Sequence, residues 1–378
     1  MISASERPLT RGPWARRVRT LLTVQSLPER NWKARGGNVS LLGDAQLYRG
    51  GSRPLDLRNP NERALLLAIK EAYVHRTGSP AVDALVNVLG LKRITREAVG
   101  QASNQLDRPL LGFLRRPIRG LHPYLLLETV VVPVRTGDTI RSSTVVFAIG
   151  VRSSGHREVL GAEVTEELNA GAWLQFLRGL TRRGLDGVRL VTADDHAGLQ
   201  PALRAVLPAA AWQRCLTHFL RDAVEAVPAS GRLFASATLR RIFAQPDREA
   251  ARRAVEQVTR RVARRNPGLA QLLREADPAC LTYFDFPVEH RRQIWSTNAE
   301  RVVGELTRRC DFVGTFPNRR ALLRLVAEVL EQQDAGWQAA GPYCRGRSES
   351  ALSLREMFQP FRRLGVESSD GVLVGAVA

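Results

Sequence analysis

The chain has 378 residues, long enough for two or three domains, and its 44% hydrophobic and 25% charged content is ordinary for a globular protein. It contains no run of eighteen apolar residues and no apolar segment near its N-terminus, so we expect neither a membrane span nor a signal peptide. Its formal net charge of +19 is far from that of an ordinary globular protein. This charge predicts an anionic partner, and nucleic acid is the first candidate.

Arginine supplies almost all of the positive charge, since the only lysines are Lys33, Lys70 and Lys92. A compositional bias of the genome explains the high ratio of arginine to lysine, but it does not explain the excess of basic over acidic residues. Arginine also suits phosphate, because its planar fork binds two oxygens at once. The cysteines form no CxxC pair, which favours a reducing cytoplasm over a disulfide scaffold, and we expect a cytoplasmic protein associated with the nucleoid. They are Cys215, Cys280, Cys310 and Cys344.

The first 120 residues divide into two parts. Residues 1–55 combine glycine pairs, prolines and arginines without a sustained period, so we expect an irregular basic arm. Residues 56–120 show helical periodicity. Ser79 is the expected cap of one helix, with Pro80 in its first position, and Thr95 begins the next.

The two helices on either side of residues 90–94 resemble a helix-turn-helix motif. In that arrangement the second helix would face DNA through Arg96, Gln101 and Asn104. An ordinary helical hairpin with a solvated face would show the same pattern. Both interpretations stay open, and we assign residues 56–120 to a helical DNA-binding region.

Residues 121–345 have the pattern of one α/β domain. Strands are expected at residues 124–135, 143–151, 157–164, 188–193 and 211–215, and helices around residues 173–180, 199–207 and 218–227. A meander of three strands followed by alternating helices and strands is the order of a ribonuclease-H-like catalytic core. The tail, residues 346–378, is expected to be peripheral.

A helical insertion at residues 229–285 interrupts this core. One of its helices, at about residues 248–265, carries paired arginines outside an apolar stripe of alanine and valine. A solvated charged face would explain them, but so many arginines in one inserted region favour a surface that faces phosphate. These residues are Arg252, Arg253, Arg260, Arg261, Arg264 and Arg265.

An acidic stretch at residues 187–199 organises the core. A β-branched strand ends in Asp194, Asp195 and His196, and a glycine and a helical pattern follow. This pattern delivers carboxylates to the C-terminal edge of a sheet, where α/β proteins bind ligands. Because buried carboxylates need a positive partner, a divalent metal ion is the candidate. Neighbouring strand residues point to opposite faces, so we expect only Asp194 to be a ligand.

Phosphoryl transfer on nucleic acid needs an activated nucleophile and a stabilised leaving oxygen, and two metal ions held by a few carboxylates supply both. The candidate ligands for Mg²⁺ or Mn²⁺ are Glu128 in the first strand, Asp194, and Glu300 on a late helix capped by Ser296 or Thr297. Apolar residues flank Glu128, so its carboxylate must be paired, protonated or metal-bound. The alternative is that Glu128 points to solvent from an edge strand.

Several motifs resemble those of the Mutator-type transposases of bacterial insertion sequences. Besides the acidic stretch they are residues 212–219 (WQRCLTHF), 294–298 (IWSTN) and 313–318 (VGTFPN), in the same order within about residues 60–345. The resemblance implies a DDE transposase with a ribonuclease-H-like core, a helical insertion before the last acid, and metal-dependent cleavage and joining of DNA ends. Its partners would be DNA, as terminal repeats and target, and further copies of the chain in a homo-oligomer.

In this resemblance Asp194 matches the second acid and Glu300 the third. The first acid differs from the family pattern, because the family has aspartate where this chain has Glu128. The extra methylene moves the carboxylate by about one C–C bond, and two-metal geometry tolerates little displacement. Either the site adapts or the element is decayed, and we expect Glu128→Asp to raise cleavage. The rival interpretations are a catalytically impaired DNA-binding relic and a ribonuclease-H-like nuclease without strand transfer.

Three further residues near these motifs have supporting roles. Cys215 and His218 match a Cys-x-x-His pair typical of the family, but two ligands do not make a zinc site, so we expect them to pack beside the active site. His196 would position a phosphate or a water, or serve as a capping or core histidine. Glu305 lies about 140° around the helix from Glu300 and is expected to face elsewhere.

Overall fold

A computed structural model describes residues 63–88, 95–276 and 279–344 of the chain. The predicted arm at residues 1–55, the tail at residues 346–378 and the connection at residues 90–94 lie outside the described residues. Within the described ranges, no helix is both long enough and apolar enough to cross a membrane.

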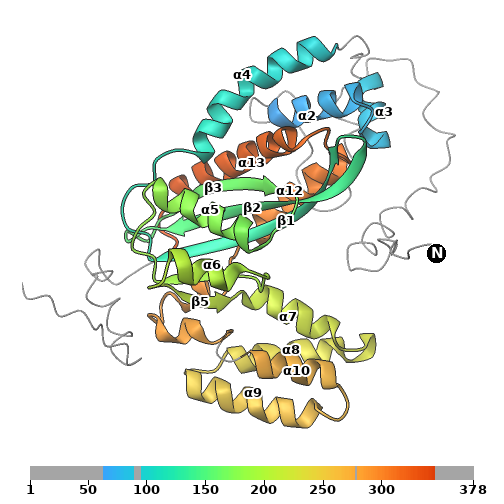
Figure 1. The fold of residues 1–378 in the computed structure, drawn as a ribbon. Coiled ribbons are helices and arrows are strands. Elements are labelled where there is room, and N and C mark those ends of the chain that lie inside the picture. The colour runs from blue at the N-terminus through green and yellow to red at the C-terminus, as the bar shows by residue number, and fades with distance from the viewer. Residues whose placement is uncertain (1–62, 89–94, 277–278, 345–378) are drawn as a thin grey trace, which may run out of the picture. The chain divides into compact units, whose positions relative to one another are not determined.

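A five-stranded mixed sheet forms the centre of the fold, with strand order β3-β2-β1-β4-β5 (Figure 1). The first three strands form an antiparallel meander, and β4 and β5 run parallel to β1. All five predicted strands are confirmed. They are β1 (Tyr124–Thr136), β2 (Thr139–Val151), β3 (Arg157–Thr165), β4 (Leu190–Ala193) and β5 (Ala211–Arg214).

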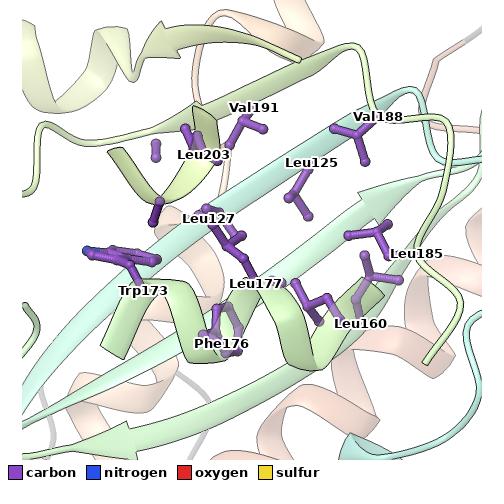
Figure 2. Close-up of a cluster of buried hydrophobic side chains, with 14 of the residues drawn as sticks. Leu125, Leu127, Leu160, Trp173, Phe176, Leu177, Leu185, Val188, Val191 and Leu203 are labelled. Atoms are coloured by element: carbon purple, nitrogen blue, oxygen red, sulfur yellow. The ribbon is translucent and has the colours of Figure 1, made fainter. Parts of the chain in front are cut away.

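One face of the sheet buries the main hydrophobic core under α5 (Ala170–Arg182) and α6 (Leu199–Val206) (Figure 2). Alternate residues point to this face because side chains alternate along a strand. Leu125 and Leu127 of β1 and Val191 of β4 lie in the core beside the helices, which supply Trp173, Phe176, Leu177 and Leu203. Residues 124, 126 and 128 of β1 therefore face the opposite side of the sheet.

The opposite side is covered by two late helices, α12 (Glu300–Val313) and α13 (Arg319–Ala340) (Figure 1). Buried side chains of the second helix continue as far as Trp337. Its inner face also supports the N-terminal helices of the described chain. These are α2 (Arg63–Val74), α3 (Pro80–Val88) and α4 (Arg96–Leu114).

The three N-terminal helices confirm the helical region predicted for this part of the chain. Thr95 caps α4 by accepting a 3.2 Å hydrogen bond from the backbone N–H of Ala98. Both α3 and α4 pack on α2, while α4 also contacts α13 and α3 contacts α12. The helix-turn-helix interpretation stays a prediction, since the turn at residues 90–94 is outside the described residues.

A buried ion cluster joins these helices. Arg324 of α13 lies 3.1 Å from Glu71 of α2 and 2.7 Å from Asp107 of α4, and its side chain is only 2% exposed. Buried charges persist where each has partners, so this cluster fixes the three helices relative to one another.

The predicted insertion is helical and packs as a small bundle with α7 (Leu216–Glu225). On the long basic helix, Ala251 and Val255 face inward. The elements between α7 and α12 are η3 (Ala229–Gly231), α8 (Arg232–Phe243), α9 (Arg248–Val262), α10 (Pro267–Glu275), η4 (Thr282–Asp285) and α11 (Arg291–Ile294).

Candidate active site

The β1–β4 pairing brings two of the predicted carboxylates together. Leu126 and Thr192 are partners in the parallel register of the two strands. Continued by two residues, this register sets Glu128 beside Asp194, on the sheet face opposite the hydrophobic core. Neighbouring strands lie about 4.8 Å apart, so the two side chains share one site.

Glu128 is buried, with 5% of its surface exposed, and both of its carboxylate oxygens have partners. Thr297 Oγ1 donates to Oε2 at 2.7 Å, and the backbone N–H of Thr129 donates to Oε1 at 3.1 Å. His218 Nε2 lies 3.5 Å from Oε1. The alternative in which Glu128 points to solvent is therefore wrong.

Burial and charge determine how Glu128 and its neighbours ionise. Burial raises the pKa of the Glu128 carboxyl, and the nearby Asp194 charge acts in the same direction against His218. Burial alone would lower the pKa of His218, but the Cys215 thiol and the Glu128 carboxylate raise it to about 9. The pKa of Glu128 stays raised despite His218 at 3.5 Å, so a further cation beside this carboxylate would stabilise its ionised form.

Asp194 lies just beyond the end of β4, with 20% of its side chain exposed. The backbone N–H of Asp195 donates to its Oδ1 at 2.8 Å. Two arginines approach it at longer range, Arg214 at 3.9 Å and Arg221 at 3.8 Å. These separations exceed a hydrogen bond, so Asp194 has capacity for another ligand. Asp195 is exposed, whereas Asp194 is partly buried.

Ser296 and Thr297 do not cap the late helix, and that prediction is wrong. Helix α12 begins at Glu300 after Ala299, and no side chain caps its first turn. Thr297 instead donates to Glu128. Leaving a buried carboxylate without a hydrogen-bond donor costs more free energy than leaving a helix N-terminus uncapped where water can reach it. The Thr297 hydroxyl therefore donates to the carboxylate and not to the helix.

Ser296 joins the same network from the other side. Its hydroxyl lies 2.8 Å from Thr217 Oγ1 and 3.1 Å from the Sγ of Cys215, which is buried at the start of α7. Thr297 Oγ1 also lies 3.7 Å from that sulfur. Cys215 and His218 thus lie beside Glu128, as expected for residues that pack against the active site.

Glu300 is the first residue of α12 and is exposed. It follows Asn298, whose positive φ of 49° is held by a 2.7 Å hydrogen bond from its side-chain amide to Tyr343. Across the described ranges, no group of three or more His, Cys, Asp or Glu side chains is arranged to hold a metal ion. A third-ligand role for Glu300 therefore stays a prediction. Glu305 pairs with neighbouring arginines of its own helix.

His196 lies next to the site, but its ring forms no hydrogen bond with the carboxylate of Glu128 or Asp194. Its Nε2 lies 3.2 Å from the Thr129 hydroxyl, and its ring lies 5.7 Å from that of Trp173. Burial lowers the pKa of His196, which favours the neutral ring. This environment suits a packed histidine that fixes the backbone beside Glu128.

The residues predicted to contact DNA lie on the surface of two separate helices. On α4, Arg96, Gln101 and Asn104 are exposed. The arginines predicted on α9 and just beyond it are exposed as well, namely Arg252, Arg253, Arg260, Arg261, Arg264 and Arg265. Both sets are therefore accessible to a polyanion.

Comparison with known proteins agrees with this arrangement. The sequence model described as "Transposase, Mutator family" matches residues 53–340, which cover the whole sheet, the insertion and both late helices. The chain belongs to the Mutator family of transposases.

Three relatives illustrate how far the similarity extends. The transposase of insertion sequence IS1081 from Mycobacterium tuberculosis is 36% identical over 285 residues, which are 75% of this chain and 69% of the relative. The IS406 transposase of Burkholderia multivorans is 38% identical over 286 residues, 75% and 74% of the two chains. The IS256 transposase of transposon Tn4001 from Staphylococcus aureus is 28% identical over 282 residues, 73% and 72%.

The donor set of this transposase fits a hydrated divalent metal ion. Mg²⁺ prefers oxygen ligands, keeps several of its waters, and is commonly held by one or two carboxylates together with substrate phosphates. Glu128 and Asp194 provide such a pair, and Glu128 is a buried carboxylate with a raised pKa that a cation would stabilise.

Three site residues of the transposase escaped sequence reasoning. Thr297 was predicted as a helix cap, and Arg214 and Arg221 received no role. The signal for Arg214 lies in the WQRCLTHF stretch, where a strand ends in a cation beside the cysteine and histidine. Pairing β5 with β4 is what brings Arg214 level with the acidic strand end.

Proposed function

We propose that this transposase cleaves DNA at the ends of an insertion sequence and joins the freed ends to a target, using divalent metal ions held by Glu128 and Asp194. The observation that carries the proposal is the side-by-side placement of these two carboxylates on neighbouring strands. Family membership supports DNA strand cleavage and transfer in general. We assign Glu300 as the third ligand on the resemblance stated above.

The strand order supports a ribonuclease-H-like core. An antiparallel meander supplies β1, and two parallel strands extend the sheet beyond it. The first carboxylate then lies within β1, the second follows β4, and a helical insertion precedes the third. In the proposed site this order would bring acids from distant parts of the sequence to one sheet edge, where α/β proteins bind ligands.

In the proposed reaction, water attacks a DNA phosphodiester and releases a 3′-hydroxyl, which then attacks a second strand. When bound, Mg²⁺ or Mn²⁺ ions activate the attacking oxygen and stabilise the leaving oxygen. Glu128 and Asp194 fix the position of these ions. Thr297 holds the Glu128 carboxylate, and His218 keeps a proton on Nε2 facing Glu128 Oε1.

Cations around the site would bind the DNA backbone. Arg221 is 54% exposed and lies 3.8 Å from Asp194, so its guanidinium can turn to a phosphate at the reacting position. The exposed residues of α4 and α9 would hold the flanking DNA of each element end. We expect two or more copies of the chain to act together on paired ends, in the nucleoid.

The experiment is a cleavage and joining assay with the full chain and a labelled duplex that carries the terminal repeats of the element. We expect Mg²⁺-dependent nicks at the repeat ends, followed by joined products with a target plasmid. Nicks without joined products would favour a nuclease. Binding without either product would favour a catalytically impaired relic and contradict the proposal.

A further inference from the structure

The first turn of α8 carries two large apolar side chains in the solvent. Leu233 is 89% exposed and Phe234 is 78% exposed. Among the aromatic side chains that the structure describes, only Phe234 is exposed. The inward face of α8 is well packed through Ala235, Leu239, Ile242 and Phe243, so the exposure of the first turn is not a sign of a loosely packed helix.

The same outer face of α8 continues as a cationic stripe. Arg240 and Arg241 lie seven residues after Leu233 and Phe234, and residues seven apart fall on one helix face. Both arginines are exposed, and neither forms an ion pair with a described residue. Residues 229–276 contain eleven arginines and four acidic residues, so the surroundings are strongly positive.

The position of α8 relates this face to the active site. Phe243, at the end of α8, packs edge-to-face on Phe219 of α7 with ring centroids 5.7 Å apart. His218, the neighbour of Phe219, lies against Glu128. Phe234 is nine residues before Phe243, which corresponds to about 13 Å along the helix axis.

We propose that the outer face of α8 binds DNA next to the active site, with Phe234 stacked on an unpaired base. Leu233 would fill the space beside that base, and Arg240 and Arg241 would bind phosphates between it and the active site. The inference rests on the proposed function, because cleavage places DNA at Glu128. An exposed aromatic ring accepts the face of any base, so the contact selects an unpaired base and not a sequence.

Charge argues against a second copy of the chain as the occupant of this face. A symmetric contact between two α8 helices would bring Arg240 and Arg241 of both copies together without acids to neutralise them. Like charges at an interface disfavour association, whereas a DNA strand supplies the opposite charge at regular spacing.

The test compares two DNA probes with the full-length wild-type chain and its variants. One probe is a duplex with a single unpaired thymine, the other is the same duplex fully paired, and affinity is measured by fluorescence anisotropy. We expect wild type to prefer the unpaired probe by about 5- to 100-fold, Phe234→Ala to lose this preference, and Phe234→Trp to keep it. Ile140→Ala, which removes a similarly exposed side chain from the β1–β2 hairpin, should bind both probes as wild type does.

Three outcomes separate the possibilities. An unchanged preference in Phe234→Ala would overturn the proposal. Loss of self-association in Phe234→Ala, measured by sedimentation with DNA preference unchanged, would also overturn it and assign the face to a second copy. Cleavage at element ends is measured in parallel. A wild-type chain that prefers the unpaired probe but does not cleave would refute the proposed function and leave the base contact of Phe234 standing.

Discussion

The Thr297 hydroxyl donates a 2.7 Å hydrogen bond to Glu128 Oε2 and thereby joins two segments 169 residues apart in the chain. Glu128 belongs to β1, and Thr297 belongs to the turn before α12. The bond fixes the buried carboxylate, so the site is complete only when the turn before α12 packs against β1.

Removing this hydroxyl is expected to weaken the metal site. Thr297→Val keeps the shape of the side chain but leaves Glu128 Oε2 without its donor. Outer partners of metal ligands contribute about 10- to 100-fold to metal affinity or activity, so we expect losses of that size in Mn²⁺ affinity and cleavage. Mn²⁺ binding followed by electron paramagnetic resonance measures the first effect directly.

The matched control is Thr297→Ser, which retains the donor and should keep near-normal activity. The Thr297 hydrogen bond lowers the pKa of Glu128, so its loss should move the acidic limb of the pH–rate profile to higher pH. A purely structural role for Thr297 would lower activity equally at every pH and in both variants.

Shortening the first carboxylate is expected to raise activity. Glu128→Asp withdraws the carboxylate by about 1.5 Å and restores the side chain implied by the family resemblance. Because small displacements at a reacting centre cost up to about 100-fold, we expect a gain of about 10-fold or more in Mg²⁺-dependent cleavage. Unchanged or lower activity in this variant would count against the assignment of Glu128 as the first acid.

A second carboxylate, far from the active site, should control stability at low pH. Glu158 of β3 accepts hydrogen bonds from His122 and Arg152. His122 Nε2 lies 2.8 Å from Oε1, and Arg152 Nη2 donates to Oε2 at 2.8 Å. Burial alone would raise the pKa of Glu158, but these partners lower it from 4.5 to about 2. A folded-state pKa below the unfolded value stabilises the protein above about pH 4.5, and this contribution is lost as pH falls toward 2.

We expect Glu158→Gln to destabilise the protein at pH 7, with a pH-dependent part of about 3 kcal/mol. Urea unfolding of both proteins at several pH values measures the difference. The gap between wild type and variant should narrow below pH 4.5, where wild type loses the same charge. A gap that stays constant down to pH 3 would contradict the assigned pKa of Glu158.

The ion cluster around Arg324 leads to a second stability prediction. Arg324→Met removes the cation that neutralises buried Glu71 and Asp107. Breaking a buried ion pair from one side typically costs about 3 to 5 kcal/mol, and we expect a loss of that size in the free energy of unfolding. Arg319→Ala, on the same helix but 51% exposed beside Glu166, should change it by less than about 1 kcal/mol.

Sequence patterns predicted the framework of the fold because local physics determines it. The apolar run on both sides of Glu128 predicted a strand, and the carboxylate at the end of the 188–193 segment predicted a site at the sheet edge. The five strands and the helical insertion are confirmed. These features depend on residues close together in the chain.

Side-chain partners could not be predicted in the same way. Thr297 is a residue type typical of a helix cap. Its hydroxyl donates to Glu128 only because the turn before α12 packs against β1. The approach of Arg221 to Asp194 likewise depends on where α7 lies relative to β4. Both are contacts across the fold, which no periodicity in the sequence encodes.

The central claim is that Glu128 and Asp194 together hold the metal ions that cleave DNA. Its most direct test is Mg²⁺-dependent nicking of an element-end duplex by wild type, Glu128→Gln and Asp194→Asn, each shown by circular dichroism to be folded. We expect either carboxamide variant to lose about 100-fold or more in rate, because each removes a charged metal ligand at the reacting centre. Cleavage by either variant at the wild-type rate would contradict the claim.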